Sequence, residues 1–217
     1  MRYSSDAAGD RRKVVLATHN AHKIEEFGAI VGATRPDLEV VGYDGPEPVE
    51  DGVTFAENAL IKARAAATHT GLPALADDSG ICVDVLGGAP GVFSAYWAGH
   101  AKDAAANLDL LLDQLSDVRD PHRAASFVST IALVVPGADG TAEHVVEGRW
   151  PGRLASAPAG AGGFGYDPIF VPDGQPEGAE RTVGEWDAAE KNASSQDRKS
   201  TRLNSSHTDI SRMPSSA

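Results

Sequence analysis

The spacing of the apolar residues changes along this chain, and this change restricts its fold more than any other feature. Val14–Ala17 form a short apolar run, and from Lys23 apolar side chains recur at helical spacing as far as Gly32. This pattern predicts a strand, a turn and a helix. Residues 127–135 and 142–150 are strand-like runs instead, and the PGADG segment between them predicts a hairpin. The alternation indicates a mixed α/β fold.

The remaining segments predict further helices and strands. Thr54 and Glu57 form a capping box that opens a helix ending near Gly71. Leu72–Ala76 and Ile81–Leu86 are expected to be two strands joined by a tight turn at DDSG. The last predicted elements are helices over 103–115 and 187–195 and a short strand over 169–171.

Composition excludes several classes of protein. The chain has 19 Lys and Arg against 31 Asp and Glu, a net charge of −12, which disfavours binding to a nucleic acid backbone. Its single cysteine, Cys82, cannot form an internal disulfide, and its place in an apolar run predicts a core position. The polar N-terminal segment lacks the hydrophobic region expected of a signal peptide, and no apolar stretch of about 18 residues is long enough to span a membrane. We expect a cytoplasmic protein that binds no membrane.

The two ends of the chain differ from the middle in composition. We expect residues 1–12 to be a disordered extension, residues 13–196 to form a single domain, and residues 197–217 to be a disordered tail. The tail is rich in serine, and most of it corresponds to the translation of a sequencing-library adapter, with 208–210 encoded by its variable index. We therefore interpret the tail as non-native.

The first segment with chemical potential is ATHNAHK, residues 17–23, where the first predicted strand meets its helix. Backbone amides at a helix start, the side chains of Thr18 and Asn20, and the Lys23 ammonium could together hold phosphate oxygens. The alternative is that Thr18 or Asn20 only caps the helix and that Lys23 is solvated.

The second segment is ADDSG, residues 76–80. Mg²⁺ prefers oxygen ligands, so Asp77, Asp78 and an acid from Glu50 or Asp51 could form a metal site, and a carboxylate there could also activate water. The alternative is a solvated acidic turn with Gly80 at a positive φ.

The third segment is GAGGFGYDP, residues 160–168, which contains the spacing of a dinucleotide fingerprint. That fingerprint needs a helix to begin inside it, whereas Pro168 and a predicted strand follow here. A glycine-rich loop with Phe164 and Tyr166 could instead let a planar base approach and stack, or it could be a structural turn with core aromatics.

Taken together and in this order, the motifs resemble the inosine/xanthosine triphosphate pyrophosphatase family, also described as dITP/XTP pyrophosphatases. The resemblance covers about residues 14–196 and rests on VLATHNAHKIEEF, TFAENALIKARAAA, LPALADDSGICVDVLGGAPG and PAGAGGFGYDPIF. It implies an elongated mixed sheet with helices on its faces and two lobes around a nucleotide cleft. It also implies a Mg²⁺-dependent homodimer that converts ITP, dITP or XTP to the nucleoside monophosphate and pyrophosphate.

The resemblance also assigns roles to single residues. Asp78 would be the general base and, with Glu50, would bind Mg²⁺ in the same cleft as Lys23. The substrate-binding residues it implies, for the triphosphate and for the purine, are Thr18, His19, Asn20, Ala21, His22, Lys23, Ser79, Phe164, Gly165, Tyr166, Asp167 and Lys191.

The chain departs from the family pattern at two places. After EKNA, relatives have a Ser-His-Arg segment that donates to the 6-oxo group of the base, whereas Gln196 and Asp197 follow Ser195 here. We therefore expect this chain to bind ITP weakly and to discriminate poorly against ATP or GTP. Tyr96 stands where many relatives have arginine. The alternatives are a septum-inhibitor-type nucleotide pyrophosphatase, or a nucleotide-binding protein without turnover.

Overall fold

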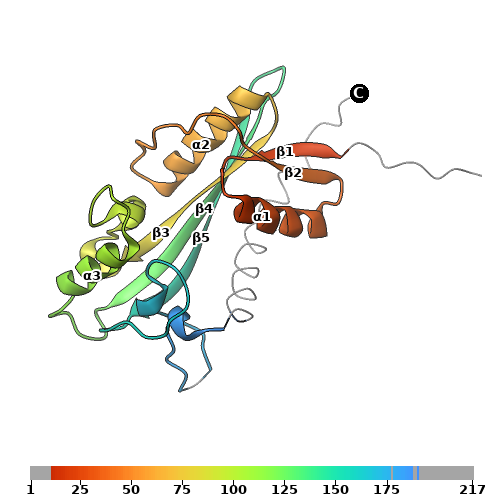
Figure 1. The fold of residues 1–217 in the computed structure, drawn as a ribbon. Helices are drawn as coiled ribbons and strands as arrows, with labels where there is room; N and C mark the ends of the chain where they lie inside the picture. The colour runs from red at the N-terminus through yellow and green to blue at the C-terminus, as the bar shows by residue number, and fades with distance from the viewer. Residues whose placement is uncertain (1–10, 177, 188–189, 191–217) are drawn as a thin grey trace, which may run out of the picture.

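A single six-stranded sheet forms the centre of the molecule (Figure 1). The computed structural model describes residues 11–176, 178–187 and 190. The strand order is β2-β1-β3-β4-β5-β6; β1 is parallel to β2 and β3, and the other neighbours are antiparallel. The strands are β1 (Arg12–Leu16), β2 (Leu38–Gly42), β3 (Ala74–Val83), β4 (Ala124–Val135), β5 (Ala142–Leu154) and β6 (Phe170–Pro172). This mixed sheet confirms the predicted α/β class.

Three α-helices begin where the sequence predicts them. They are α1 (Ala21–Thr34), α2 (Phe55–Thr70) and α3 (Ala104–Gln114), and short 3-10 turns lie at Asp84–Leu86 (η1), Gly91–Tyr96 (η2), Asp167–Ile169 (η3) and Val183–Glu185 (η4). The capping box of Thr54 and Glu57 opens α2, and Gly71, at φ 70°, ends it. Asp103 caps α3 through two backbone amides. The helix predicted over 187–195 lies almost wholly outside the described residues.

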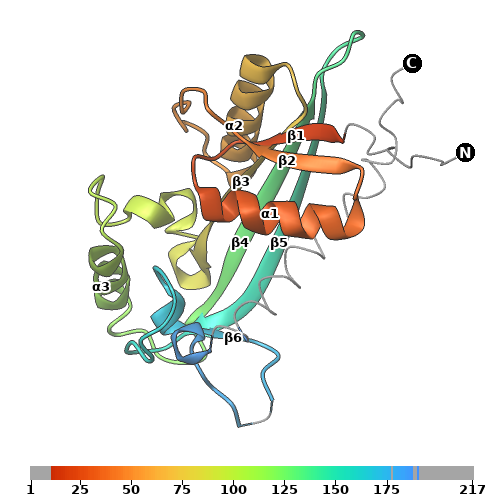
Figure 2. The same ribbon diagram turned by 45° about the vertical axis from the view of Figure 1, so that its right-hand side comes forward.

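Helices α1 and α2 cover opposite faces of the sheet (Figure 2). On one face the alanines of α2 pack against Ala74 and Ala76 of β3; on the other, Phe27 and Val31 of α1 pack in one cluster with Leu75. Successive side chains of a strand point to opposite faces, so these alternating contacts assign each β3 residue to a face.

A second core fills the other end of β3, β4 and β5. Ile81 and Val83 of β3 pack there with Leu111 of α3 and with Ile169 and Phe170. The long sheet therefore has packed helices near both of its ends (Figure 1). No helix in the described part of the chain has the length and apolar character needed to span a membrane.

The prediction of a tight turn at DDSG is wrong. Residues 74–83 form one continuous strand, and Asp77, Asp78 and Ser79 pair in register with residues 131, 130 and 129 of β4. Gly80 has no positive φ; a Cβ at this position would meet Ser94 and the Gly91 carbonyl. The cross-strand pairing with β4 outweighs the local turn preference of Asp, Ser and Gly. Residues 84–86, predicted as strand, form η1.

The predicted hairpin and the predicted core cysteine are both confirmed. β4 and β5 pair antiparallel from Val135 and Ala142 onward, and both strands are longer than the sequence predicts. The short strand predicted over 169–171 corresponds to β6. Cys82 is buried next to Phe55 and Val128.

Candidate active site

The loop between β1 and α1 is held by its own side chains. Asn20 Oδ1 accepts hydrogen bonds from the backbone amides of His22 (3.0 Å) and Lys23 (3.3 Å), so Asn20 caps α1. The backbone amide of Asn20 in turn donates to Thr18 Oγ1 at 3.2 Å. Ala21 is the first residue of the helix, and the His22 side chain is exposed. Asn20 therefore caps α1, as the sequence predicts for Thr18 or Asn20.

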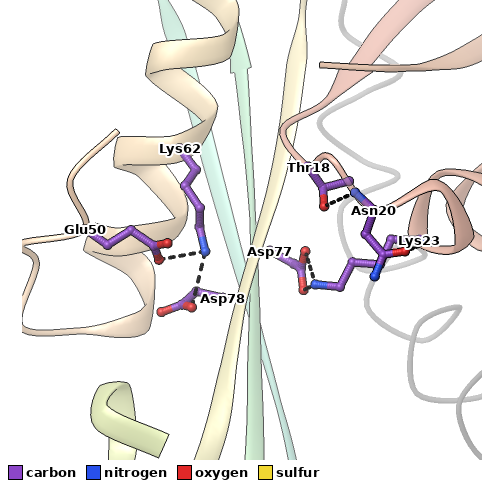
Figure 3. Close-up of polar contacts among 7 residues, drawn as sticks. All are labelled: Thr18, Asn20, Lys23, Glu50, Lys62, Asp77 and Asp78. Atoms are coloured by element: carbon purple, nitrogen blue, oxygen red, sulfur yellow. Dashed lines mark hydrogen bonds and ion pairs between the residues drawn. The ribbon is translucent and has the colours of Figure 1, made fainter. Parts of the chain in front are cut away.

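Lys23 is paired with a carboxylate, although its side chain is still 42% exposed. Its ammonium lies 2.9 Å from Asp77 Oδ2 and 3.1 Å from Asp77 Oδ1 (Figure 3). Asp77 follows Leu75 by two positions, so it lies on the face of the sheet that α1 covers. The start of α1 and the middle of β3 are joined by this ion pair.

A second ion-pair cluster lies on the face that α2 covers. The ammonium of Lys62 lies 2.9 Å from Glu50 Oε2 and 3.3 Å from Asp78 Oδ1. The sequence analysis did not single out Lys62. A helical-face analysis could have found it. Lys62 lies on the buried face of α2, with Phe55, Ala59 and Ala66. A lysine on a buried helix face needs a charged partner.

Burial raises the pKa of Asp78, and the charge of Glu50 adds to the increase, while Lys62 and the Asn58 side chain oppose it. Burial also lowers the pKa of Lys62, but the charges of Asp78 and Glu50 outweigh this effect, and the pKa is raised overall. Asp78 Oδ2 is buried and accepts no hydrogen bond from the described residues. The Asp78 carboxylate therefore keeps one oxygen available for a ligand.

The two aspartates point to opposite faces of β3. Figure 3 shows Asp77 with Lys23 on one side of the strand and Asp78 with Lys62 and Glu50 on the other. The structure therefore brings neither Lys23 nor Asp77 into contact with the Asp78 cluster. Pairing of β1 with β3 ends at Leu75, so Asp77 and Asp78 follow directly beyond the end of β1 and near the loop that carries Thr18.

His19 links the β1–α1 loop to the segment that carries Glu50. Its ring nitrogens lie 3.0 Å from Glu47 Oε1 and 3.1 Å from the Gly45 carbonyl, and the ring stacks on Tyr43. The hydrogen bond to Glu47 raises the pKa of His19. Asp51, the other acid considered for the metal, is exposed.

The glycine-rich loop contains one exposed and one buried aromatic ring. Phe164 is 84% exposed, whereas Tyr166 is 6% exposed and its hydroxyl donates to the Ser94 carbonyl at 2.9 Å. Asp167 Oδ2 accepts from the Phe164 amide at 3.0 Å. Gly165 has φ 60°, a conformation that favours glycine. Of the two rings, only Phe164 presents a free face.

The other predicted site residues are less constrained. Ser79 is exposed in the middle of β3. Lys191 lies outside the described residues. Within residues 11–176, 178–187 and 190, no group of three or more His, Cys, Asp or Glu side chains is close enough to hold a metal ion. The described carboxylates of the site are therefore Asp77, paired with Lys23, and the couple Glu50 and Asp78, bridged by Lys62.

Comparison with known proteins gives consistent matches along most of the chain. The model of the Ham1 family matches residues 14–203. The chain is 61% identical to the dITP/XTP pyrophosphatase of Leifsonia xyli over 183 residues, which are 84% of this chain and 88% of that protein. It is 57% identical to the dITP/XTP pyrophosphatase of Streptomyces coelicolor, covering 83% and 89%.

Solved structures of similar proteins share the fold. The nucleoside-triphosphatase, or dITP/XTP pyrophosphatase, of Mycobacterium abscessus has a TM-score of 0.75 at 46% identity, covering 88% of this chain and 98% of that one. A HAM1 protein from Coxiella burnetii has a TM-score of 0.76 at 38% identity, covering 89% and 99%.

Proposed function

This chain belongs to the Ham1 family, and we propose that it hydrolyses the non-standard purine nucleoside triphosphates dITP, XTP and ITP to the monophosphate and pyrophosphate. The names of its relatives support the reaction class, that of a hydrolase acting on the anhydride bonds of a triphosphate. The observation that carries the proposal is the partly buried Asp78 carboxylate, whose buried Oδ2 has no partner among the described residues and which lies next to Glu50 and Lys62.

The residues around Asp78 fit a Mg²⁺ ion. Mg²⁺ takes oxygen ligands and keeps several waters, so two carboxylates are a sufficient protein contribution. Thr130 pairs with Asp78 across β3 and β4, so both side chains point to one face, and Thr130 Oγ1 also has no partner among the described residues. Glu50 and Asp78 would hold the ion, and the ion would neutralise charge on the triphosphate.

The hydrolytic step needs a base that can accept a proton from water. Asp78 suits this role because burial, with the charge of Glu50 adding to it, raises its pKa above the usual value of an aspartate, which favours acceptance of a proton. The water that it deprotonates would attack one phosphorus atom of the anhydride between the α and β phosphates. The bridging P–O bond would break, which releases the nucleoside monophosphate and pyrophosphate. In-line attack requires a fixed phosphate chain, which the remaining residues must supply.

We assign binding of the phosphate chain to the β1–α1 loop and binding of the purine to the glycine-rich loop. The backbone amides at the start of α1 favour anions, and Lys23 adds a cation that is already close to the strand. Because Lys23 and Asp78 lie on opposite faces of β3, the substrate would have to pass the edge of the strand beyond Leu75. The exposed ring of Phe164 can stack on a purine, with Asp167 and Lys191 contributing polar contacts.

We also propose that the protein acts in the cytoplasm as a homodimer. Light scattering of the purified chain tests the dimer: a mass near 45 kDa, about twice the 22.6 kDa of one chain, is expected. A monomeric mass at all concentrations contradicts it.

Release of pyrophosphate from ITP in the presence of Mg²⁺ tests the proposed reaction. Asp78→Asn keeps the size of the side chain but removes both the general base and a proposed metal ligand. We therefore expect turnover to fall by at least about 100-fold, while ITP binding measured without Mg²⁺ persists. Asp113→Asn is the control, because Asp113 is an exposed acid on α3, outside the proposed site, and should leave turnover unchanged. Binding of ITP without turnover in the unmodified chain would mean a nucleotide-binding protein that is not an enzyme.

A further inference from the structure

The ammonium of Lys62 occupies the space between the two proposed metal ligands. It lies 2.9 Å from Glu50 Oε2 and 3.3 Å from Asp78 Oδ1, and its side chain is only 18% exposed. The Lys62 backbone is fixed, because α2 begins with a capping box, ends at Gly71 and packs its alanines against β3 and β4. The charged end of the side chain, however, is carried on a flexible four-carbon stem.

We propose that Lys62 is a built-in counter-cation that holds Glu50 and Asp78 in place when no metal is bound and that the metal displaces. This inference rests on the proposed function, since it takes Glu50 and Asp78 as the ligands. The side chain of Asp78 is 17% exposed and that of Glu50 is 43% exposed. Their two carboxylates repel each other, and the ammonium between them offsets that repulsion in the metal-free protein.

A divalent cation that bridges Glu50 and Asp78 would lie close to the Lys62 ammonium, which already contacts Glu50 Oε2 and Asp78 Oδ1. The mutual repulsion of the two cations at such short distances is large in a partly buried site. The dication interacts more strongly with each carboxylate, but its binding must include the cost of moving Lys62 away from two partners. Lys62 therefore lowers the affinity of the empty site for metal.

A triphosphate changes this balance. Its oxygens give the displaced ammonium a new anionic partner, so the cost of moving Lys62 falls when nucleotide is present. Metal and nucleotide then bind cooperatively, and by linkage each increases the affinity for the other by the same factor. The lysine would couple loading of the metal to arrival of the substrate.

Titration with Mn²⁺, followed by electron paramagnetic resonance in the absence of nucleotide, tests the inference directly. Lys62→Met keeps an unbranched side chain of similar length without the charge, and we expect it to bind Mn²⁺ about 10-fold more tightly than the unmodified chain. Lys62→Arg keeps a cation and should bind Mn²⁺ weakly. Arg64→Met is the matched control: it removes a cation from the same helix, and Arg64 is exposed and pairs with Glu143.

Two further variants separate this inference from the proposed function. Glu50→Gln and Asp78→Asn should each weaken Mn²⁺ binding strongly; if neither does, the proposed metal ligands are wrong. If both do, but Lys62→Met binds no more tightly than the unmodified chain and Arg64→Met, the displacement of Lys62 is wrong while the proposed function stands.

A measurement on the unmodified chain avoids dependence on the folding of the variants. The side-chain amine of Lys62 can be followed by nitrogen-15 NMR during addition of Mg²⁺. We expect its resonance to move toward that of a solvated lysine, whereas the resonance of Lys23 should change little until a nucleotide is added. A Lys62 resonance that is unchanged at saturating Mg²⁺ overturns the inference.

Discussion

The hydroxyl of Tyr166 donates a hydrogen bond to the carbonyl oxygen of Ser94. Ser94 Oγ in turn accepts from the amide of Ile81, at 2.9 Å, and donates to the Gly91 carbonyl. These bonds form a short path from the loop that carries Phe164 to the strand that carries Asp78. The position of the exposed ring is therefore tied to β3 by buried hydrogen bonds and not by the loop alone.

Tyr166→Phe should weaken substrate binding without altering Asp78, the proposed general base. Burial raises the pKa of Tyr166 to about 12, so the hydroxyl remains a donor at any pH at which the enzyme is assayed. Losing it leaves the Ser94 carbonyl without this donor, at a cost of about 1 kcal/mol in the free energy of unfolding. We expect KM for ITP to rise about fivefold with little change in kcat. A fall in kcat at unchanged KM would contradict this role.

Gly80→Ala should destabilise the protein by about 1 to 3 kcal/mol, measured by urea unfolding. The added Cβ would overlap Ser94 Oγ and the Gly91 carbonyl, and η2 would have to move away from β3. Combining it with Ser94→Ala removes only the first overlap, so the double variant should not recover full stability. Gly71→Ala is a different case: no atom lies near its added Cβ, and the cost comes from φ 70° alone.

The attachment of His19 to Glu47 should depend on pH. The pKa of His19 is raised above 6.5 by Glu47, so the native state binds the proton more tightly than the unfolded chain. The stabilisation is fully present below about pH 6.5 and is lost as the pH rises through the higher native value. Titration by NMR should give a lower pKa for His19 in Glu47→Gln. An unchanged value would mean that the contact does not persist in solution.

Arg123 should be essential for stability although it lies outside the cluster of Glu50, Lys62 and Asp78. Its buried guanidinium donates to the carbonyls of Leu115, Val118, Leu154 and Ala155. Arg123→Met should lower the free energy of unfolding by about 3 kcal/mol or more, because several buried carbonyls lose their donor.

Two controls accompany this prediction. Arg123→Lys should be only a partial rescue, because one ammonium cannot reproduce the guanidinium fork. Arg119→Met, which replaces an exposed arginine nearby, should change stability by less than about 0.5 kcal/mol. Equal stabilities of Arg123→Met and Arg119→Met would refute the structural role of Arg123.

Selectivity among purines should improve when Gln196→His and Asp197→Arg are combined. These changes recreate the histidine and arginine that the family resemblance places after Ser195, and such donors favour a 6-oxo base over a 6-amino base. We expect the ratio of kcat/KM for ITP over ATP to rise at least about 100-fold. An unchanged ratio would show that these donors do not set selectivity in this chain.

Local sequence signals predicted α2 well. Its capping box, its run of helix formers and the closing glycine are short-range features, and each depends on residues within one or two turns. The N-cap of α1 by Asn20 is equally local. The prediction failed at DDSG because β4, more than 40 residues later in the chain, decides whether those residues turn or continue as a strand.

The contents of the site were predicted better than its geometry. Glu50 and Asp78 do lie close together, but the sequence did not indicate that Lys62 joins them. Treating Asp77 and Asp78 as members of one turn implied a common pocket with Lys23. In a strand, successive side chains point to opposite faces, so Asp77 and Asp78 lie on different faces of β3. Lys23 lies on the face of Asp77, with which it forms an ion pair.

Because β3 contributes to the alanine core at Ala74 and Ala76 and to the other core at Ile81 and Val83, its two carboxylates lie at the junction of both. We expect a substitution that loosens either core to shift the part of β3 that carries Asp78. Thermostable variants of this protein should therefore be assayed for turnover one by one, because substitutions in either core can move the strand that carries Asp78.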